Sequence, residues 1–393
     1  MVKYYSADYI LPVTNEPFKN GTIAVDGNGA ILDVFREGDP QLNGKEIQRF
    51  EGIIVPGFVN CHCHLELAGL HGKIKKGTGL IGFIKEVIGA RRHGEKPEND
   101  TEAMKRADRQ MYENGIVAVG DISNVIASKS IKQESSLYYH TFIEILSFEP
   151  EKAKDVFRAG TELFQAFQPL KASVVPHAPY SVSRELFRYM SKFCWETGSI
   201  LSIHNQESEE ENKLFRYKTG GFVDFYKDLH INIDFFKAQA RNSVQSFIPL
   251  MPERQKLLLV HNTYTSTKDL YFIKRSERDA SFCFCPNANL YIENRLPKID
   301  MFLLDDFNIT LGTDSLASND KLCILSELKA IHAAFPSLKL TDTIKWATLN
   351  GARFLEVADR FGSLEKGKKA GINLISNTRG LELTASSSVK KLA

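Results

Sequence analysis

Eight short apolar runs, each about as long as a β-strand, recur along the middle of the chain, and amphipathic stretches separate most of them. Continuous apolar strands that alternate with helices are typical of a parallel sheet that is buried on both faces. Eight of them predict an α/β fold whose sheet closes into a (β/α)8, TIM-like barrel. The eight runs are Ile53–Asn60, Ile116–Ile122, Tyr138–Leu146, Lys171–Pro176, Ile200–His204, Lys256–His261, Ser281–Cys285 and Asn308–Gly312.

The stretches between these runs have the spacing of helices, and Glu102–Asn114 and Ala153–Phe167 are clear examples. An open, doubly wound sheet is the alternative architecture. That fold usually has a Gly-rich turn directly after its first strand, whereas the first run here leads into Cys61–His64. The closed barrel is therefore the preferred prediction.

The two ends of the chain predict a second, smaller β unit. Asp26–Gly29 is a strong hairpin signal among the β-rich runs of the N-terminus. At the other end we expect a helix over Thr341–Val357, a strand over Ala370–Ser376 and a frayed tail from Ser386 onward. The N-terminal runs are Lys3–Leu11, Gly21–Asp26, Ala30–Phe35 and Glu46–Phe50. The resulting division assigns residues 1–55 and 360–393 to a small β-sandwich and residues 56–359 to the barrel.

Charge and targeting signals narrow the class of partner. Of the 393 residues, 50 are Lys or Arg and 48 are Asp or Glu, so the net charge is only +2. Without a basic stripe, nucleic acid is not the expected partner, and a small molecule is. The chain shows neither a signal peptide nor an apolar span for a membrane, so we expect it in the cytoplasm. A homodimer is left open.

The six cysteines are too few for a disulfide scaffold in a chain of this length. Cys61 and Cys63 alternate with two histidines, and alternate residues of a strand face opposite sides, so four neighbours cannot converge on one ion. Cys283 and Cys285 repeat the spacing in an apolar run. We interpret all four as buried thiols that act as small hydrophobic groups.

The ends of the predicted strands are rich in histidine, and five of the ten histidines lie there. Active sites of such barrels collect at the C-terminal ends of the strands. The sequence therefore predicts a catalytic site at this end of the barrel. The strand-end side chains are His62, His64, His177, His204, His261 and Asp314.

This combination of side chains indicates a metal. His62 and His64 are two residues apart, so both imidazoles face one side of a strand and can bind one ion at about 2.0–2.1 Å. Taken alone, the pair could equally be core or surface residues. Three imidazoles and a carboxylate suit one divalent cation, with zinc favoured and iron as the alternative. A site for two metals would need a bridging carboxylate, which is often a modified lysine at the end of the fourth strand. That end is Pro176–Pro179 and contains no lysine, so a single metal is favoured.

Glu207 lies three residues after His204. A carboxylate beside a metal-bound water can carry a proton from that water to the substrate. The alternative is a solvated charge, because the acidic run continues to Glu211; the neighbouring ligand favours the functional interpretation. The histidines that we expect to be surface or structural residues are His71, His93 and His140.

The strand-end motifs resemble those of the amidohydrolase superfamily and occur in the order of that family. The spacing of His204 and Glu207 is similar to that found in one branch of the superfamily. The enzymes of this branch deaminate aminated heterocycles, such as adenosine, S-adenosylhomocysteine and guanine. The motifs are Val55–His64, Pro176–Tyr180, His204–Ser208, Leu259–Asn262, Cys285–Asn289 and Leu311–Ser315. The resemblance implies metal ligation by His62, His64, His204 and Asp314, a proton shuttle at Glu207, orientation of the hydroxide by His261 and Asp314, and substrate contact at His177.

A narrower similarity concerns the substrate. His64–Leu67, a Gly-rich loop and Phe83–Arg91 together resemble aminodeoxyfutalosine deaminases of menaquinone synthesis. This implies an adenine-type nucleoside such as aminodeoxyfutalosine or S-adenosylhomocysteine. The same site could instead hydrolyse a cyclic amide or displace chloride or an amine from a triazine. A non-catalytic metal-binding protein is the distant alternative. The loop Leu70–Gly82 has the glycines of a mobile lid, with a plain surface loop as the alternative.

Overall fold

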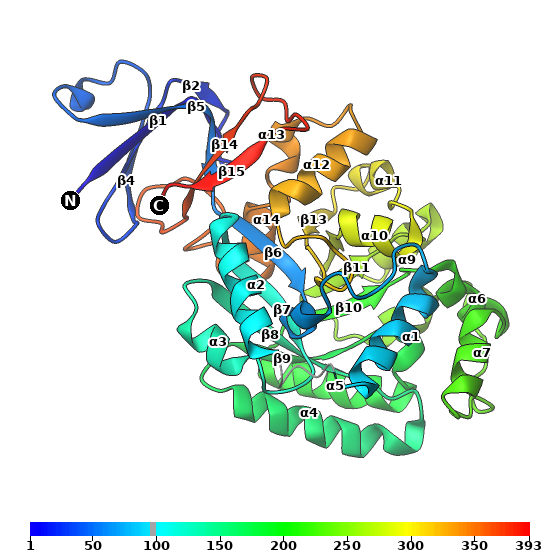
Figure 1. Ribbon diagram of the computed structural model, residues 1–393. Helices are drawn as coiled ribbons and strands as arrows, with labels where there is room; N and C mark the ends of the chain where they lie inside the picture. The colour runs from blue at the N-terminus through cyan, green and yellow to red at the C-terminus, as the bar shows by residue number, and fades with distance from the viewer. Residues whose placement is uncertain (95–99) are drawn as a thin grey trace.

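The computed structural model of the chain describes residues 1–94 and 100–393. At its centre, parallel strands form a ring with helices around it (Figure 1). The strands belong to two four-stranded sheets, each in sequence order. They are β6 Phe58–Cys63, β7 Ile116–Ser123, β8 Tyr138–Ile145 and β9 Ala172–Pro176, then β10 Leu201–Asn205, β11 Leu257–His261, β12 Ala280–Phe284 and β13 Asn308–Leu311.

Backbone hydrogen bonds join the two sheets at the C-terminal ends of their strands. On one side, the N–H of His204 donates to the carbonyl oxygen of His177, 3.0 Å away. On the other, the N–H groups of Thr313 and Asp314 donate to the carbonyl oxygen of His62 at 3.1 and 3.0 Å. The predicted barrel is confirmed, and both seams run through residues of the predicted site.

The sequence explains why the barrel strands are central and the helices outside. All eight residues of β7 are buried, as expected of a strand covered on both faces. The helix α4 begins and ends where its pattern predicted, and only Ala153, Gly160 and Phe167 of it are buried. The helices are α1 Gly79–Arg92, α2 Thr101–Glu113, α3 Lys129–Glu134, α4 Ala153–Phe167, α5 Arg184–Thr197, α6 Glu209–Tyr217, α7 Gly221–Asp228, α8 Ser243–Phe247, α9 Thr267–Arg275, α10 Pro286–Glu293, α11 Ile299–Leu303, α12 Ile324–Ala334, α13 Leu340–Thr343 and α14 Leu349–Phe354.

Both termini contribute to one further sheet, beside the barrel (Figure 1). Its seven strands are hydrogen-bonded in the order β15-β14-β5-β1-β3-β4, with β2 next to β1. The predicted hairpin turn is confirmed, since Asp26 Oδ1 accepts the N–H groups of Asn28 and Ala30, both at 2.8 Å. The strands are β1 Lys3–Ile10, β2 Phe18–Lys19, β3 Thr22–Val25, β4 Ile31–Phe35, β5 Ile47–Pro56, β14 Ile372–Ser376 and β15 Ser388–Lys391. The exact division into domains stays a prediction.

An apolar cluster separate from the barrel core lies among segments that follow the C-terminal ends of the strands. It is rich in aromatic rings: Phe148 stacks on Tyr226, and Tyr180 stacks on Phe222. The contributing elements include α1, α6, α7 and α10. These elements therefore cover the end of the barrel that carries the predicted site. Among residues 1–94 and 100–393, no helix combines the length and apolar character needed to cross a bilayer.

The prediction that Ile53–Asn60 is a single barrel strand was wrong. The run is divided between two sheets: β5 continues to Pro56 and pairs with β14, and β6 starts at Phe58. Gly57 separates them, and its N–H donates to the carbonyl oxygen of Ala370 in the C-terminal segment. An apolar run shows that residues are buried, but not which sheet takes them.

The predicted helix Thr341–Val357 is also broken, into α13 and α14 with a turn between them. The carbonyl oxygen of Ala347 accepts the N–H of Val59 on β6 at 2.8 Å. Thr348 has φ −139° and ψ −94°, which is not helical. A backbone contact with the first barrel strand therefore replaces the continuous helical hydrogen bonds.

The tail predicted to fray from Ser386 forms strand β15 instead. It pairs antiparallel with β14, and the N–H of Leu392 donates to the carbonyl oxygen of Ile372 at 2.8 Å. The polar side chains of this segment hid its strand character, because an edge strand is held by backbone groups.

Candidate metal centre and active site

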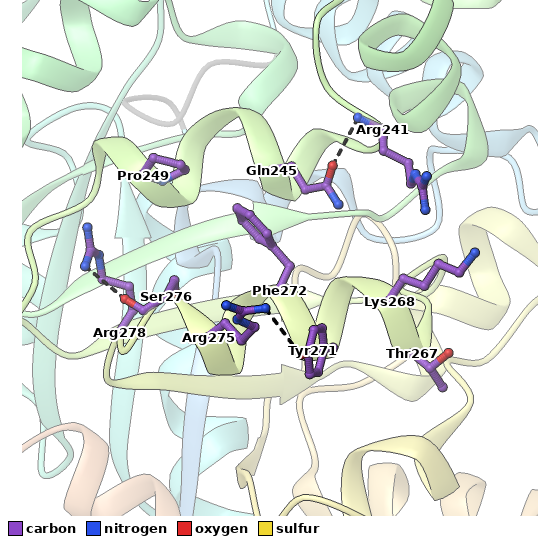
Figure 2. Close-up of a pocket in the computed structure, with 10 residues that line it drawn as sticks. All are labelled: Arg241, Gln245, Pro249, Thr267, Lys268, Tyr271, Phe272, Arg275, Ser276 and Arg278. Atoms are coloured by element: carbon purple, nitrogen blue, oxygen red, sulfur yellow. Dashed lines mark hydrogen bonds between the residues drawn. The ribbon is translucent and has the colours of Figure 1, made fainter.

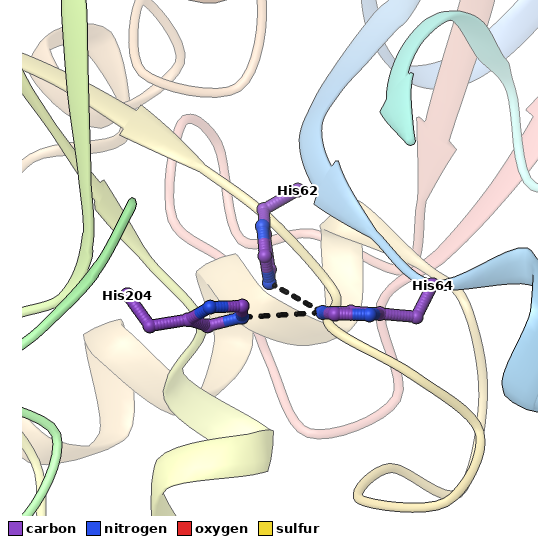
Figure 3. A group of neighbouring side chains, drawn as sticks. All are labelled: His62, His64 and His204. Carbon is purple, nitrogen blue, oxygen red and sulfur yellow. Dashed lines mark hydrogen bonds between the residues drawn. The ribbon is translucent and has the colours of Figure 1, made fainter. Parts of the chain in front are cut away.

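Three imidazoles meet at the C-terminal end of the barrel (Figure 3). His62 and His64 come from the end of β6 and His204 from β10. The Nε2 atom of His64 lies 3.1 Å from Nε2 of His62 and 3.2 Å from Nε2 of His204. Residues that are 140 positions apart in the chain thus point their ring nitrogens at a common centre.

Asp314 completes this group. Its Oδ1 atom lies 3.6 Å from Nε2 of His62 and 3.4 Å from Nε2 of His64. Its other oxygen, Oδ2, accepts a hydrogen bond from Ser318 Oγ at 2.6 Å. One carboxylate oxygen is thereby fixed, and the other faces the imidazoles.

The spacing of these atoms fits a single metal ion. Ligand atoms of a tetrahedral site with bonds of about 2.0–2.2 Å lie about 3.3–3.6 Å apart, and the four distances here run from 3.1 to 3.6 Å. Hydrogen bonds alone explain the cluster poorly, since Nε2 of His64 faces two other ring nitrogens and carries at most one proton. His62, His64, His204 and Asp314 therefore have the donor set and the spacing for one divalent cation.

The protonation states also suit a metal. Burial lowers the pKa of His64 and His204 well below the ordinary value, and neighbouring imidazoles lower it further. Burial alone would raise the pKa of Asp314, but His62 and the other nearby imidazoles outweigh it and keep that pKa well below its usual value. Neutral imidazoles and an ionised carboxylate are the forms that bind metal.

Partners behind His204 fix its tautomer. Its Nδ1 atom donates to the carbonyl oxygen of His177 at 2.8 Å, and Glu144 Oε1 lies 3.5 Å from the same nitrogen. With the proton on Nδ1, the lone pair of Nε2 is free to face the centre. Metal-binding histidines commonly have such a partner on the second ring nitrogen.

His261 and Glu207 lie together beside the cluster. His261 is grouped with His62 and Asp314, whose ligand atoms all lie within 4.8 Å of one another. Nδ1 of His261 hydrogen-bonds to Asn289 Oδ1 at 2.9 Å, and its Nε2 lies 3.7 Å from Glu207 Oε1. The fold places these two residues next to the cluster, as predicted from the sequence. Their roles in catalysis stay predictions.

Glu207 is buried, unlike the solvated charge considered as the alternative. Burial raises the pKa of its carboxyl well above the usual value, and the nearby charges of Asp314 and Glu293 raise it further. This environment favours the protonated form and so equips the group to donate a proton. At the end of the acidic run, Glu211 is also buried and accepts the N–H of Gln206, whereas Glu209 and Glu210 are partly exposed.

Unusual backbone conformations turn the chain at these strand ends. Gln206, His261, Asn262 and Asp314 all have positive φ, between 46° and 70°. The left-handed region costs a non-glycine residue about 1–3 kcal/mol and is enriched at active sites. Here it ends β10, β11 and the β13 segment so that their side chains face the mouth of the barrel.

His177 lies at the edge of the metal cluster. Its ring centroid is 5.0 Å from that of His204, and its Nδ1 atom is 2.6 Å from Ser181 Oγ. Ser181 Oγ uses its own proton to donate to the carbonyl oxygen of Ala178, so it can accept a hydrogen bond from Nδ1 of His177. His177 is therefore placed next to the centre, in a position that suits contact with a substrate.

The remaining predicted side chains lie away from the centre. His71 and His93 are exposed, as expected, and His140 is buried with Nε2 2.8 Å from Ser173 Oγ. The thiols predicted to be buried and unpaired are so: Cys61, Cys63, Cys283 and Cys285.

The sequence pattern that defines the amidohydrolase family matches residues 53–391. The match extends over most of the chain and includes every strand of the barrel and all the predicted site residues. The chain belongs to the amidohydrolase family. The family resemblance drawn from the strand-end motifs is thus confirmed.

The proteins with similar sequences or folds include several deaminases and also an atrazine chlorohydrolase from Arthrobacter aurescens, which has a TM-score of 0.74 at 16% identity over 94% and 86% of the two chains. The adenosine deaminase of Helicobacter pylori is 28% identical over 335 residues, which cover 83% of this chain and 80% of that protein. The structure of Helicobacter pylori aminofutalosine deaminase in complex with methylthio-coformycin has a TM-score of 0.80 at 24% identity, over 97% and 93% of the two chains. An adenosine deaminase from Xanthomonas campestris with bound zinc has a TM-score of 0.74 at 21% identity, over 95% and 84%.

Three polar side chains that support this amidohydrolase site were not predicted: Glu144, Asn289 and Ser318. They contact His204, His261 and Asp314 respectively. Glu144 had a signal in the sequence, since it is an acidic residue inside an apolar run. Asn289 is the last residue of the motif Cys285–Asn289, and Ser318 had no signal beyond its nearness to the motif Leu311–Ser315.

The predicted lid loop is shorter than expected, because α1 already begins at Gly79. The segment before it is attached to α10: Tyr291 Oη donates to the carbonyl oxygen of Ile74 at 2.6 Å, and Glu293 accepts the N–H of Leu80 at 2.8 Å. Its role as a lid stays a prediction.

A surface groove of about 740 Å³ lies on the outside of the barrel, along α9 (Figure 2). It is basic, with Arg241, Lys268, Arg275 and Arg278 along it. None of the residues that line it belongs to the histidine cluster. This groove therefore does not locate the chemistry of this amidohydrolase; the converging side chains do.

Proposed function

We propose that this amidohydrolase is a metal-dependent deaminase of an adenine-type nucleoside, with one zinc ion and water as the nucleophile. Aminodeoxyfutalosine and S-adenosylhomocysteine are the preferred substrates. The relatives named above act on adenosine or aminofutalosine, which supports a nucleoside with an exocyclic amine.

The observation that carries the proposal is the buried carboxyl of Glu207 beside His261 and the metal cluster. Deamination of a purine needs a group that gives its proton to a ring nitrogen and, after it has taken up a proton released by the attacking water, gives this second proton to departing ammonia. A carboxyl with a raised pKa can do both near neutral pH. Hydrolysis of the amine then gives the ring carbonyl and one molecule of ammonia.

The other side chains would divide the remaining tasks. When bound at His62, His64, His204 and Asp314, a divalent cation supplies the Lewis acidity that makes water nucleophilic near pH 7. Asp314 and His261 would orient the attacking water, and Nε2 of His261 would accept its proton. His177, at the rim of the cluster, would contact the base. Three imidazoles and one carboxylate favour zinc, and ferrous iron is the alternative.

The proposal is tested by measuring ammonia release from a panel that contains adenosine, S-adenosylhomocysteine, aminodeoxyfutalosine, guanine and a pterin that carries an amino group. We expect ammonia from the adenine-type nucleosides. A cyclic amide and a chlorotriazine complete the panel. If either of these reacts while no aminated substrate releases ammonia, the deaminase assignment is wrong.

A further inference from the structure

A buried ion pair lies behind the strand that carries His62 and His64. Asp121 on β7 and Lys132 on α3 have no exposed side-chain surface, and Oδ2 and Nζ are 2.7 Å apart. Asp121 is in register with Cys63 of the parallel strand β6, so it lies on the face opposite to the two histidines. Burying two charges costs free energy that their attraction only partly returns. Packing alone therefore does not account for the pair.

The ammonium group of Lys132 is held in one position. Besides the ion pair with Asp121, it donates hydrogen bonds to Ser123 Oγ at 2.9 Å and Thr141 Oγ1 at 3.1 Å. Three oxygens therefore surround the ammonium group. The ring of Phe167 lies 5.2 Å from Nζ and closes the site on the apolar side. The lysine in turn fixes the carboxylate of Asp121.

The second oxygen of Asp121 reaches the metal-binding segment. Oδ1 accepts the N–H of Leu65, the residue directly after His64, at 2.8 Å. At the opposite edge of the segment, the carbonyl oxygen of His62 accepts the N–H of Asp314. We propose that the Asp121–Lys132 pair is a positioning device: it fixes the backbone after His64 and thereby sets the affinity of the metal centre. This inference rests on the metal centre of the proposed function.

The decisive variant is Asp121→Leu/Lys132→Met. Replacing a buried ion pair by apolar side chains of similar volume is often neutral for stability or increases it. The N–H of Leu65 nevertheless loses its acceptor. We expect the metal-free variant to have a melting temperature close to that of the metal-free wild type, but a zinc Kd raised about 10–100-fold, as for other outer contacts of metal ligands. The Kd is measured by titrating the metal-free protein with zinc against a chromophoric chelator.

The matched control is Ile131→Ala, one residue away on α3 and also buried. It opens a cavity and lowers the melting temperature, but it leaves the Leu65–Asp121 hydrogen bond in place, so the zinc Kd should not change. The visible spectrum of the cobalt-loaded protein gives a second readout. It should differ from wild type in the double variant and not in Ile131→Ala.

A wild-type zinc Kd in the double variant overturns the proposal, as does an equal loss of affinity in Ile131→Ala. If the double variant does not fold, Asp121→Asn is used instead, because the single carbonyl oxygen of the asparagine must serve both Lys132 and Leu65. A wild-type zinc Kd in Asp121→Asn would also overturn the proposal. Since zinc binding is measured without substrate, weakened binding in a protein that deaminates no nucleoside would support the pair and refute only the proposed reaction.

Discussion

At the scale of single residues, three side chains of the candidate centre have a partner on the polar atom that faces away from it. His204 Nδ1 donates to a carbonyl oxygen, His261 Nδ1 pairs with Asn289, and Asp314 Oδ2 accepts from Ser318. In each case the remaining atom faces the centre in a defined state. Such preparation lowers the entropy lost when a metal or substrate binds.

The first prediction concerns Glu207. Glu207→Gln keeps the shape of the side chain but cannot carry a proton, so turnover should fall about 10²–10⁴-fold or more. Metal content, measured by atomic absorption, should not change. Glu162→Gln, an exposed carboxyl on α4, is the control and should behave like the wild type. Normal turnover in Glu207→Gln would refute the role of this group as proton shuttle.

The second prediction concerns the acid stability contributed by His140. Burial, followed by the charges of Lys171 and Lys132, lowers the pKa of His140 to about 3. In the unfolded chain the pKa is about 6.5. As the pH falls from 6.5 toward 3, the unfolded state binds a proton that the folded state does not, so stability is lost in this window.

His140→Gln removes this titration. The free energy of unfolding should then fall less between pH 7 and pH 5, by about 2 kcal/mol at 1.36 kcal/mol per pKa unit. Urea unfolding at the two pH values measures the difference. The exposed His93→Gln is the control, and an unchanged pH dependence in His140→Gln would contradict the prediction.

At the scale of elements, the chain directly after β13 lies very close to β6 at the point where the barrel closes. A Cβ atom at Gly312 would lie 2.7 Å from Cβ of His62 and 2.9 Å from its carbonyl oxygen. The backbones can approach closely only because this residue has no side chain. The seam of the barrel and the position of His62, a candidate metal ligand, therefore depend on one glycine.

The third prediction follows from this contact. Gly312→Ala should lower stability by about 1–3 kcal/mol, because the extra methyl forces the strands apart, and it should weaken zinc binding through His62. Gly89→Ala in α1 is the control, since a Cβ there meets nothing within 4 Å. It should keep or increase stability, by up to about 1 kcal/mol. Calorimetry and zinc titration measure both effects.

At the scale of the whole molecule, the two halves of the barrel meet at the metal end. The candidate ligands come from β6, β10 and the segment after β13, so they belong to both four-stranded sheets. A cation held by all of them would link the halves in addition to the backbone seams. Because such a site is assembled only in the folded state, binding should stabilise the fold.

The fourth prediction concerns metal removal. At a free zinc concentration of 100 Kd, stabilisation is about 2.7 kcal/mol, so chelation should lower the melting temperature and zinc should restore it. A His62→Ala/His64→Ala variant is the control, and neither treatment should shift its melting temperature. A wild-type melting temperature that ignores zinc would show that these residues do not bind it.

Much of the fold and the site could be predicted from the sequence, because the relevant signals are local. Uninterrupted apolar runs mark strands that are covered on both faces, and the spacing of His62 and His64 puts both rings on one side of a strand. Parallel strands of a barrel end on one face, so strand-end histidines far apart in sequence were expected to meet. The closure of the sheet into a barrel could be predicted from the number of strands alone.

The tertiary structure alone decided the features that depend on a distant partner. The helix predicted over Thr341–Val357 is broken where a carbonyl oxygen bonds to β6, and β15 exists because β14 lies beside it. The depth of Glu207 and the contact of Glu144 with His204 likewise come from packing. Periodicity reports whether a residue is covered, whereas hydrogen-bond partners are chosen by the three-dimensional arrangement of the whole chain.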